Sequence, residues 1–343
     1  MKKIYLLALM CAVAFGAWAL YAENGVYHIG TPQDLVDFAK LVNDGQSSLK
    51  AVVTADLDMT DVDYTPIGTN DRPFTGTFDG QNHRITNLSL NTTGIKLGRD
   101  VGLVGVTDAG ALVKNLFVSG NIVANDYHAG VVAYMKSNSR VENVHSALNI
   151  DCTRDGVHQG AGIVGSLMDH SSVDRCSFTG TLKVGSDNFD CFAGIVAYTN
   201  TGTITNCANY GTLSIAAPNG YLGGIVGYFN NTECTIRGCL NAGSVTCTSE
   251  NPEYTSAIAG RVKGFDQEKI SDLYVLAGSA AQITGQSQFA SGTVTEVTVE
   301  ELGSGYVTYL MNGEELNFRP IWYQTLGQDA GPVLDGTHGI IYK

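Results

Sequence analysis

Residues 161–165 read AGIVG, and this glycine-plus-apolar motif recurs through the middle of the chain. The other copies are VGLVG (101–105), AGVVA (129–133), AGIVA (193–197), GGIVG (223–227) and a degenerate SAIAG (256–260). The glycines at the second position of the five clear copies stand 28, 32, 32 and 30 residues apart. A fixed period of this size is typical of a solenoid, in which each unit stacks on its copies because it cannot bury its apolar face alone.

A second segment follows each motif and carries apolar residues at matching positions. The copies are ITNLSL (85–90), VKNLFVSGNI (113–122), VENVHSALNI (141–150), VDRCSFTGTL (173–182), ITNCANYGTL (204–213) and IRGCLNAGSV (236–245). Short alternating runs rich in β-branched residues indicate β-strands. Crossovers between parallel strands are right-handed, so we expect an all-β fold, a right-handed parallel β-helix of roughly six to seven rungs.

Two columns of equivalent residues support this stacking. One consists of asparagines, which tolerate a bent backbone and can bond along the stack: Asn87, Asn115, Asn143 and Asn206. The next is apolar throughout: Leu88, Leu116, Val144, Cys176, Cys207, Cys239 and Leu273. Its cysteines fit small buried side chains better than a disulfide framework. The sequence leaves open any pairing among Cys152, Cys191, Cys234 and Cys247.

The two ends of the chain depart from the repeat. Residues 1–22 combine a basic start, an apolar run and Ala17-Trp18-Ala19, which predicts a cleaved signal peptide; a lipid-anchored Cys11 is the alternative. Thr31 and Pro32 predict a helix start within an N-terminal cap, 23–70. We expect the repeats to span 71–283 and a C-terminal cap to span 284–343, because uncovered strand edges aggregate.

Composition limits the partners. The formal charge is −13, and an acidic protein repels phosphate backbones, which argues against nucleic-acid binding. Anionic membrane surfaces are disfavoured for the same reason, and we expect no membrane insertion after signal removal. The protein is expected to be exported, whether to the periplasm, the cell surface or the medium.

The motif copies VGLVG, AGIVG and GGIVG resemble the GLUG motif (Gly-Leu-hydrophobic-Gly) of exported bacterial proteins, including adhesin-like and IgA-protease-associated regions. AGVVA and AGIVA depart from it at Ala133 and Ala197. The flanks, such as TPQDLVDFAKLVNDG (31–45), are similar to pieces of secreted Bacteroides- and Prevotella-type proteins. The resemblance implies a β-solenoid on an exported or surface protein of the Bacteroidetes, and it implies no settled activity.

Acidic residues supply the candidate catalytic and metal sites. Asp56 and Asp58 alternate on one face of an expected strand and could bind calcium weakly, but the sequence favours an exposed face of the first rung or a polar loop. Loops before successive motifs carry carboxylates and imidazoles that stacking would bring together: Asp126, His128, Asp155, His158 and Asp190. Carboxylate clusters of this kind perform acid–base chemistry on sugars, but no lysine or arginine repeats beside them. Beyond calcium, no cofactor is indicated.

Tyrosines form two further columns. Tyr127, Tyr221 and Tyr254 each stand three residues before the second position of a motif, and Tyr134, Tyr198 and Tyr228 directly follow a motif. Outward-pointing rings would bind a sugar chain, and inward-packed rings would hold the sheets in register. The sequence therefore favours a non-catalytic exported solenoid that displays a surface for adhesion, with a host or bacterial glycan or protein as partner. A polysaccharide lyase or glycoside hydrolase on the same scaffold is the alternative.

Overall fold

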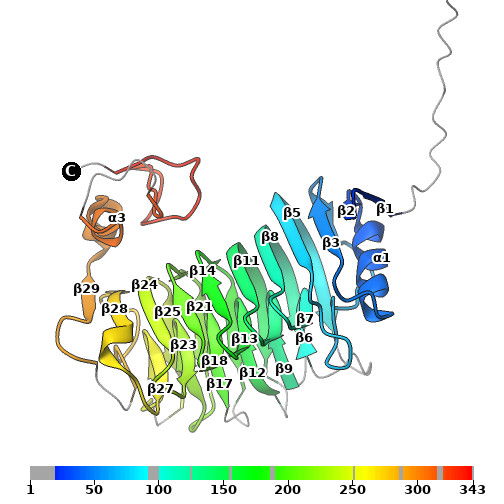
Figure 1. The fold of residues 1–343 in the computed structure, drawn as a ribbon. Coiled ribbons are helices and arrows are strands. Elements are labelled where there is room, and N and C mark those ends of the chain that lie inside the picture. The colour runs from blue at the N-terminus through cyan, green and yellow to red at the C-terminus, as the bar shows by residue number, and fades with distance from the viewer. Residues whose placement is uncertain are drawn as a thin grey trace, which may run out of the picture.

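The computed structural model describes residues 20–91, 100–123, 126–153, 157–185, 190–249, 252–285, 289–314 and 320–341. The chain forms an elongated β-solenoid whose strands stack in parallel from rung to rung (Figure 1). Two of its three sheets have six strands each, which corresponds to about six turns. The fold class predicted from the repeats is thus confirmed. Within the described residues, no helix is both long and apolar enough to cross a membrane.

Sheet A is the broad face of the solenoid. It begins with β1 (Tyr21–Glu23), β2 (Val26–Ile29), β3 (Lys50–Val53), β4 (Leu57–Asp58), β5 (Thr77–Asn91), β8 (Leu112–Val123) and β11 (Arg140–Cys152). It continues as shorter strands: β14 (Ser172–Asp174), β15 (Ser177–Phe178), β16 (Thr181–Val184), β19 (Thr203–Thr205), β20 (Ala208–Asn209), β21 (Thr212–Ile215), β24 (Thr235–Asn241), β25 (Ser244–Cys247), β28 (Ile270–Leu276) and β29 (Val294–Val297). Apart from the antiparallel β1–β2 pair, the sheet A pairings are parallel, as for β8 with β11.

The glycine motifs join the two other sheets. Sheet C contains β6 (Asp100–Val101), β9 (Asp126–Ala129), β12 (Val157–Ala161), β17 (Cys191–Ala193), β22 (Tyr221–Gly223) and β26 (Thr255–Ser256). Sheet B contains β7 (Val104–Thr107), β10 (Val132–Met135), β13 (Val164–Met168), β18 (Val196–Asn200), β23 (Val226–Phe229) and β27 (Ala259–Val262). Each motif therefore leaves sheet C, turns, and enters sheet B.

The motif glycine is required by the close approach of the next rung. A Cβ on Gly162 would lie 2.2 Å from the carbonyl oxygen of Gly194 and 2.3 Å from the ring of Phe178. A Cβ on Gly130 would likewise lie 2.2 Å from the carbonyl oxygen of Gly162. A rotamer change cannot relieve these contacts, because the atom nearest to the new Cβ is a backbone carbonyl oxygen at both positions.

The asparagine column marks a tight bend in sheet A. Its four residues adopt left-handed backbone conformations, with φ between 52° and 56°. The Asn143 side-chain amide donates to Asn115 Oδ1 at 3.0 Å, and Asn206 donates to Asp174 Oδ1 at 2.9 Å. The neighbouring Cys176, Cys207 and Cys239 are fully buried free thiols. Asparagine is favoured because it tolerates positive φ and also bonds to the adjacent rung.

A helix covers the first rungs. Helix α1 (Pro32–Asn43) begins at Thr31, whose side chain accepts a hydrogen bond from the Asp34 N–H in a capping box. Its apolar face includes Phe38, whose ring lies 6.1 Å from the rings of both Phe74 and Phe78. These aromatic contacts join the helix to the main core. The helix lies at the N-terminal end of the solenoid (Figure 1).

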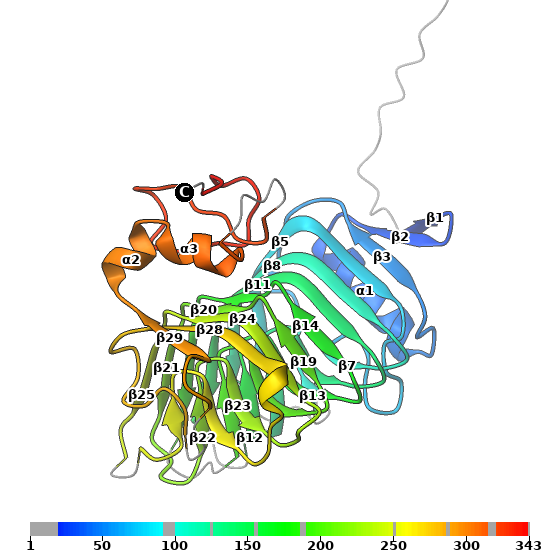
Figure 2. The ribbon, with the colours of Figure 1, turned by 60° about the vertical axis from the view of Figure 1, so that its left-hand side comes forward.

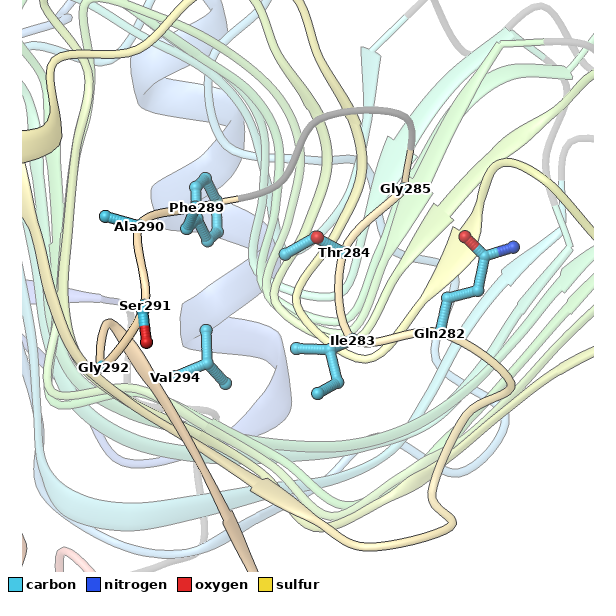
Figure 3. Close-up of a pocket in the computed structure, with 9 residues that line it drawn as sticks. All are labelled: Gln282, Ile283, Thr284, Gly285, Phe289, Ala290, Ser291, Gly292 and Val294. Carbon is cyan, nitrogen blue, oxygen red and sulfur yellow. The ribbon is translucent and has the colours of Figure 1, made fainter.

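The other end has a different arrangement. After the 3₁₀ helix η1 (Gln267–Lys269), β28 and β29 complete the last rung, beside which lies an open hollow of about 530 Å³. Ile283, Phe289 and Val294 line this hollow (Figure 3). Helices α2 (Val299–Gly303) and α3 (Tyr306–Met311) do not cover it; they lie over the flank formed by β20, β24 and β28 (Figure 2).

Residues 298–314 and 320–341 are called the C-terminal lobe below. The lobe and the flank share an apolar cluster separate from the main core, and it contains Ala208, Leu240, Tyr274, Val297, Leu302, Val307, Met311, Trp322 and Leu334. Within the expected cap at 284–343, strand β29 ends the last rung at Val297, and the C-terminal lobe packs on the flank of the solenoid. The boundaries of the cap stay a prediction.

Candidate functional site

A second small cluster of buried side chains lies outside the main core, between sheets B and C. Strand β12 ends at Ala161 and β13 begins at Val164, so the chain turns sharply between them. The outward side chains of the two strands consequently face each other, and the Ser166 hydroxyl donates to Gln159 Oε1. Ala161, Cys191 and Ala197 are fully buried at this concave corner.

Both predicted tyrosine columns line this corner. In sheet B, Tyr134 is in register with Ser166, and the column continues through Tyr198 and Tyr228 to Arg261. In sheet C, Tyr127 is in register with Gln159, and that column continues through Cys191 to Tyr221. Toward the C-terminal rungs, the two columns meet over the buried cluster.

The meeting point is a half-buried group that we call the tyrosine–arginine cluster: Tyr198, Tyr221, Tyr228, Tyr254 and Arg261. The ring of Tyr228 lies 5.6 Å from that of Tyr198 and 5.4 Å from that of Tyr221. Tyr221 also meets Tyr254 edge to face at 5.0 Å. Such tilted arrangements are the favourable ones for aromatic pairs, so the rings hold one another in place.

Arg261 links the two columns. Its guanidinium carbon lies 5.0 Å from the centre of the Tyr221 ring and 5.1 Å from that of Tyr228, and it donates to the Tyr221 hydroxyl. Cation–π contacts of this length are attractive. Partial burial raises the pKa of both Tyr198 and Tyr228, which keeps their hydroxyls neutral and able to donate. The result is a rigid surface with aromatic faces, hydroxyls and one positive charge.

Arg261 was not among the predicted residues, although the sequence carries a signal for it. Tyr134, Tyr198 and Tyr228 each directly follow a motif, and Arg261 directly follows the degenerate copy at 256–260. Treating that copy as a full member of the repeat places Arg261 in the same column.

The structure describes only part of the predicted acid–base group. The imidazole of His158 lies 5.8 Å from the Tyr127 ring, and its Nδ1 is 3.7 Å from Asp190 Oδ2. The other Asp190 oxygen accepts from the Cys191 thiol at 2.8 Å. Asp155 lies outside the described residues, and of Asp126 only the backbone, in β9, is described.

His128 does not belong to this surface. It is fully buried, and its Nε2 lies 2.8 Å from Cys152 Sγ, which is also fully buried. His128 was predicted in a loop that stacking brings together with Asp126 and His158, but it lies in strand β9, where alternation turns its side chain inward while that of Tyr127 remains outside.

Asp56 and Asp58 lie on the first rungs, where both are exposed and hydrogen-bonded to the next rung. Asp56 accepts from the Arg84 N–H at 3.0 Å, and Asp58 accepts from the Asn87 amide at 2.9 Å. These hydrogen bonds lower the pKa of both carboxyls. Among the described residues, no group of three or more His, Cys, Asp and Glu side chains is placed to hold a metal ion. Calcium binding at this pair stays a prediction.

Comparison with known proteins identifies the fold. No protein-family model matches the chain, and no curated relative matches it. It is similar to a crystal structure from Bacteroides ovatus, provisionally assigned as an immunoglobulin A1 protease, with 18% identity, a TM-score of 0.64, and coverage of 90% of this chain and 91% of that one. It is also similar to a structure named IgA1 protease, with 16% identity, a TM-score of 0.50, and coverage of 92% of this chain but 26% of that one. At these identities the likeness establishes a shared β-solenoid scaffold.

Proposed function

We propose that the protein is a non-catalytic binding scaffold, exported by a bacterium, which presents the tyrosine–arginine cluster to a glycan or protein on a host or bacterial surface. The observation that carries this proposal is the convergence of four tyrosines and one arginine on a single half-buried surface. The proposed export rests on the predicted signal peptide and on the resemblance to GLUG-motif proteins.

The composition of the cluster suits recognition. Tyrosine and arginine are the residues most enriched where binding energy concentrates, because each combines a large contact area with hydrogen-bonding groups. Mutual ring contacts and Arg261 already restrict the side chains, so little conformational entropy remains to be lost on binding. The cluster also contains no carboxylate, so its single formal charge is positive within an acidic protein.

Proteolysis is not supported by the cysteine–histidine contact that the structure describes. The names of the structural neighbours refer to those proteins, and the shared feature is the scaffold. In this chain, Cys152 and His128 are in contact, but both are fully buried. Burial raises the pKa of the Cys152 thiol, which is the opposite of the shift that activates a cysteine nucleophile.

A carbohydrate-active enzyme on the same scaffold is the alternative. The observation that favours it is the His158–Asp190 pair beside the Tyr127 ring. A glycosidase needs a second carboxyl group across the scissile bond, and the contacts described for this pair include none.

The test is an array of glycans and surface proteins probed with the chain expressed from residue 23. Tyr221→Ala and Tyr228→Ala should each weaken binding at least about tenfold. Tyr306→Ala is the matched control, because Tyr306 is 48% exposed on α3 and belongs to the C-terminal lobe. The proposal would be refuted if Tyr221→Ala and Tyr228→Ala bound as tightly as the Tyr306→Ala control. It would also be refuted if the unaltered chain bound no ligand on the array. Release of reducing ends that Asp190→Asn abolishes would establish the enzyme instead.

A further inference from the structure

A continuous column of outward side chains runs along sheet A, away from the tyrosine–arginine cluster. Strand pairing places its members in register from rung to rung: Arg84, Phe117, His145, Ser177, Ala208, Leu240 and Tyr274. Its C-terminal half is small or apolar, and its N-terminal half carries a cation, an aromatic ring and an imidazole. The apolar half is therefore suited to packing, and the polar half is suited to binding a ligand.

The C-terminal lobe covers the apolar half. Trp322 is fully buried in the cluster that contains Ala208 and Leu240, and the Tyr210 hydroxyl donates to the carbonyl oxygen of Pro332. Beyond these contacts, the lobe overhangs the rest of the column without filling the space beneath it. A cavity of about 250 Å³ remains between Phe117, His145 and Ser177 on one side and residues 332–335 on the other.

An adjoining depression extends this cavity toward the N-terminal rungs. It measures about 470 Å³ and is lined by Asn82, Arg84, Asn143 and the segment 334–337, with Phe117 and His145 shared between the two hollows. The larger hollow, of about 470 Å³, falls within the volume range of small-ligand sites. Together they form what we call the lobe groove.

Stacking fixes the side chains on the sheet side. The Arg84 guanidinium carbon lies 4.6 Å from the centre of the Phe117 ring, and the Phe117 and His145 ring centres are 4.7 Å apart. His145 Nδ1 lies 2.8 Å from Ser177 Oγ. Within the described residues, the Arg84 guanidinium contacts a ring face and forms no ion pair, so its N–H groups are available to a ligand.

Asp335 supplies the opposing charge from the lobe. Its Oδ1 accepts from the Thr337 N–H at 2.9 Å, and its Oδ2 lies 3.8 Å from His338 Nε2. His338 Nδ1 is held in turn by Asp329 Oδ2 at 2.7 Å. Asp335 lines both hollows, so a carboxylate acceptor and a guanidinium donor face the same space.

This mixture selects the class of ligand. The Asp335 carboxylate would repel an anionic ligand, and the Arg84 guanidinium would repel a cationic ligand. The groove instead offers donors and acceptors side by side, with apolar patches from Phe117 and Leu334. A neutral sugar unit has the same mixture of hydroxyl donors, acceptors and apolar C–H faces.

We propose that the lobe groove binds a short neutral oligosaccharide, with the Arg84 guanidinium and the Asp335 carboxylate hydrogen-bonding its hydroxyls. The site is separate from the tyrosine–arginine cluster and does not depend on the function proposed for that cluster. It also assigns a role to the lobe, which supplies one wall of the site.

The test is a titration of neutral, carboxylated and sulfated oligosaccharides against the chain expressed from residue 23. Neutral oligosaccharides should bind, and Arg84→Ala and Asp335→Asn should each weaken their binding about 10- to 100-fold, the loss expected for a hydrogen bond to a charged group. Arg140→Ala is the matched control, because Arg140 is exposed on sheet A outside the column and pairs with Glu142 at 2.9 Å. Arg84 and Asp335 lie outside the tyrosine–arginine cluster, so a loss of binding in both variants assigns the binding to the groove.

Trp322 emission should be recorded for each variant, because a buried indole reports that the lobe remains docked. If Asp335→Asn undocks the lobe, Arg84→Ala still decides the question, since Arg84 belongs to β5. The proposal is overturned if no neutral oligosaccharide binds, if only acidic glycans bind, or if the Arg84→Ala chain binds as tightly as the unaltered one.

Discussion

Replacing Leu240 by alanine should release the C-terminal lobe while the solenoid stays folded. Leu240 is fully buried, but it points away from the main core and into the cluster shared with Trp322. Burial of a leucine side chain contributes about 1.5–3 kcal/mol. The truncation also leaves a cavity, so we expect a loss of about 2–3 kcal/mol of docking free energy, toward the lower end of measured leucine-to-alanine costs. This corresponds to a roughly 30- to 150-fold smaller docking equilibrium constant.

The assay uses the protein's own tryptophan. The sequence contains two tryptophans, and the other, Trp18, lies in the predicted signal peptide. In the chain expressed from residue 23, emission therefore reports Trp322 alone, while far-ultraviolet circular dichroism reports the sheets. In a urea titration, Leu240→Ala should move the emission midpoint to lower urea and leave the dichroism midpoint nearly in place.

Leu213→Ala is the matched control. Leu213 is also buried, but it belongs to the main core, so its truncation should lower the dichroism midpoint. An unchanged emission midpoint in Leu240→Ala would refute the claim that this residue holds the lobe. Equal shifts of both signals in both variants would show that lobe and solenoid unfold as one unit, and the separate-cluster argument would fail.

Two further predictions concern pH and the repeat motif. Burial lowers the pKa of His145 from 6.5 to about 4, against the opposing effect of Asp335 and with a smaller contribution from Arg84. The folded state therefore disfavours the imidazolium, so the contribution of His145 to the free energy of unfolding is fully present above pH ~6.5 and falls by at most about 3 kcal/mol as the pH drops toward 4. In thermal unfolding, His145→Gln should lack this part of the dependence of stability on pH. An unchanged pH profile in the variant would contradict the prediction. Gly162→Ala should lower the free energy of unfolding by more than about 3 kcal/mol, because the new Cβ would lie 2.2 Å from the carbonyl oxygen of Gly194. Gly110→Ala, where nothing lies within 4 Å and φ is +78°, should cost about 1 kcal/mol, and equal melting temperatures for the two variants would refute the close-approach argument.

The sequence predicted the scaffold well because the scaffold is periodic. The glycine motif, the asparagine bends and the buried cysteines recur at nearly constant spacing. Each rung stacks on the one before it, so the same close approach, the same bend and the same small buried side chain are needed again. The helix at Thr31 was likewise predictable, since its capping box is a local signal.

The candidate sites were less predictable because they depend on contacts that the period does not encode. The tyrosine columns could be read from the repeats, but their convergence depends on the turn between sheets C and B. The inward direction of His128 depends on strand register, and the pairing of β9 with β12 shifts register between Val157 and Gln159. The lobe groove joins β5, β8 and β11 to a segment some two hundred residues later, and no spacing rule connects Arg84 with Asp335.

The central claim is that this solenoid binds a ligand without cleaving it. The most direct measurement takes the tightest ligand found on the array, incubates it with a stoichiometric amount of the chain, and determines its mass and reducing-end content afterwards. The account predicts saturable binding and complete recovery of the intact ligand. A shortened product, absent from a parallel incubation with Asp190→Asn, would contradict it.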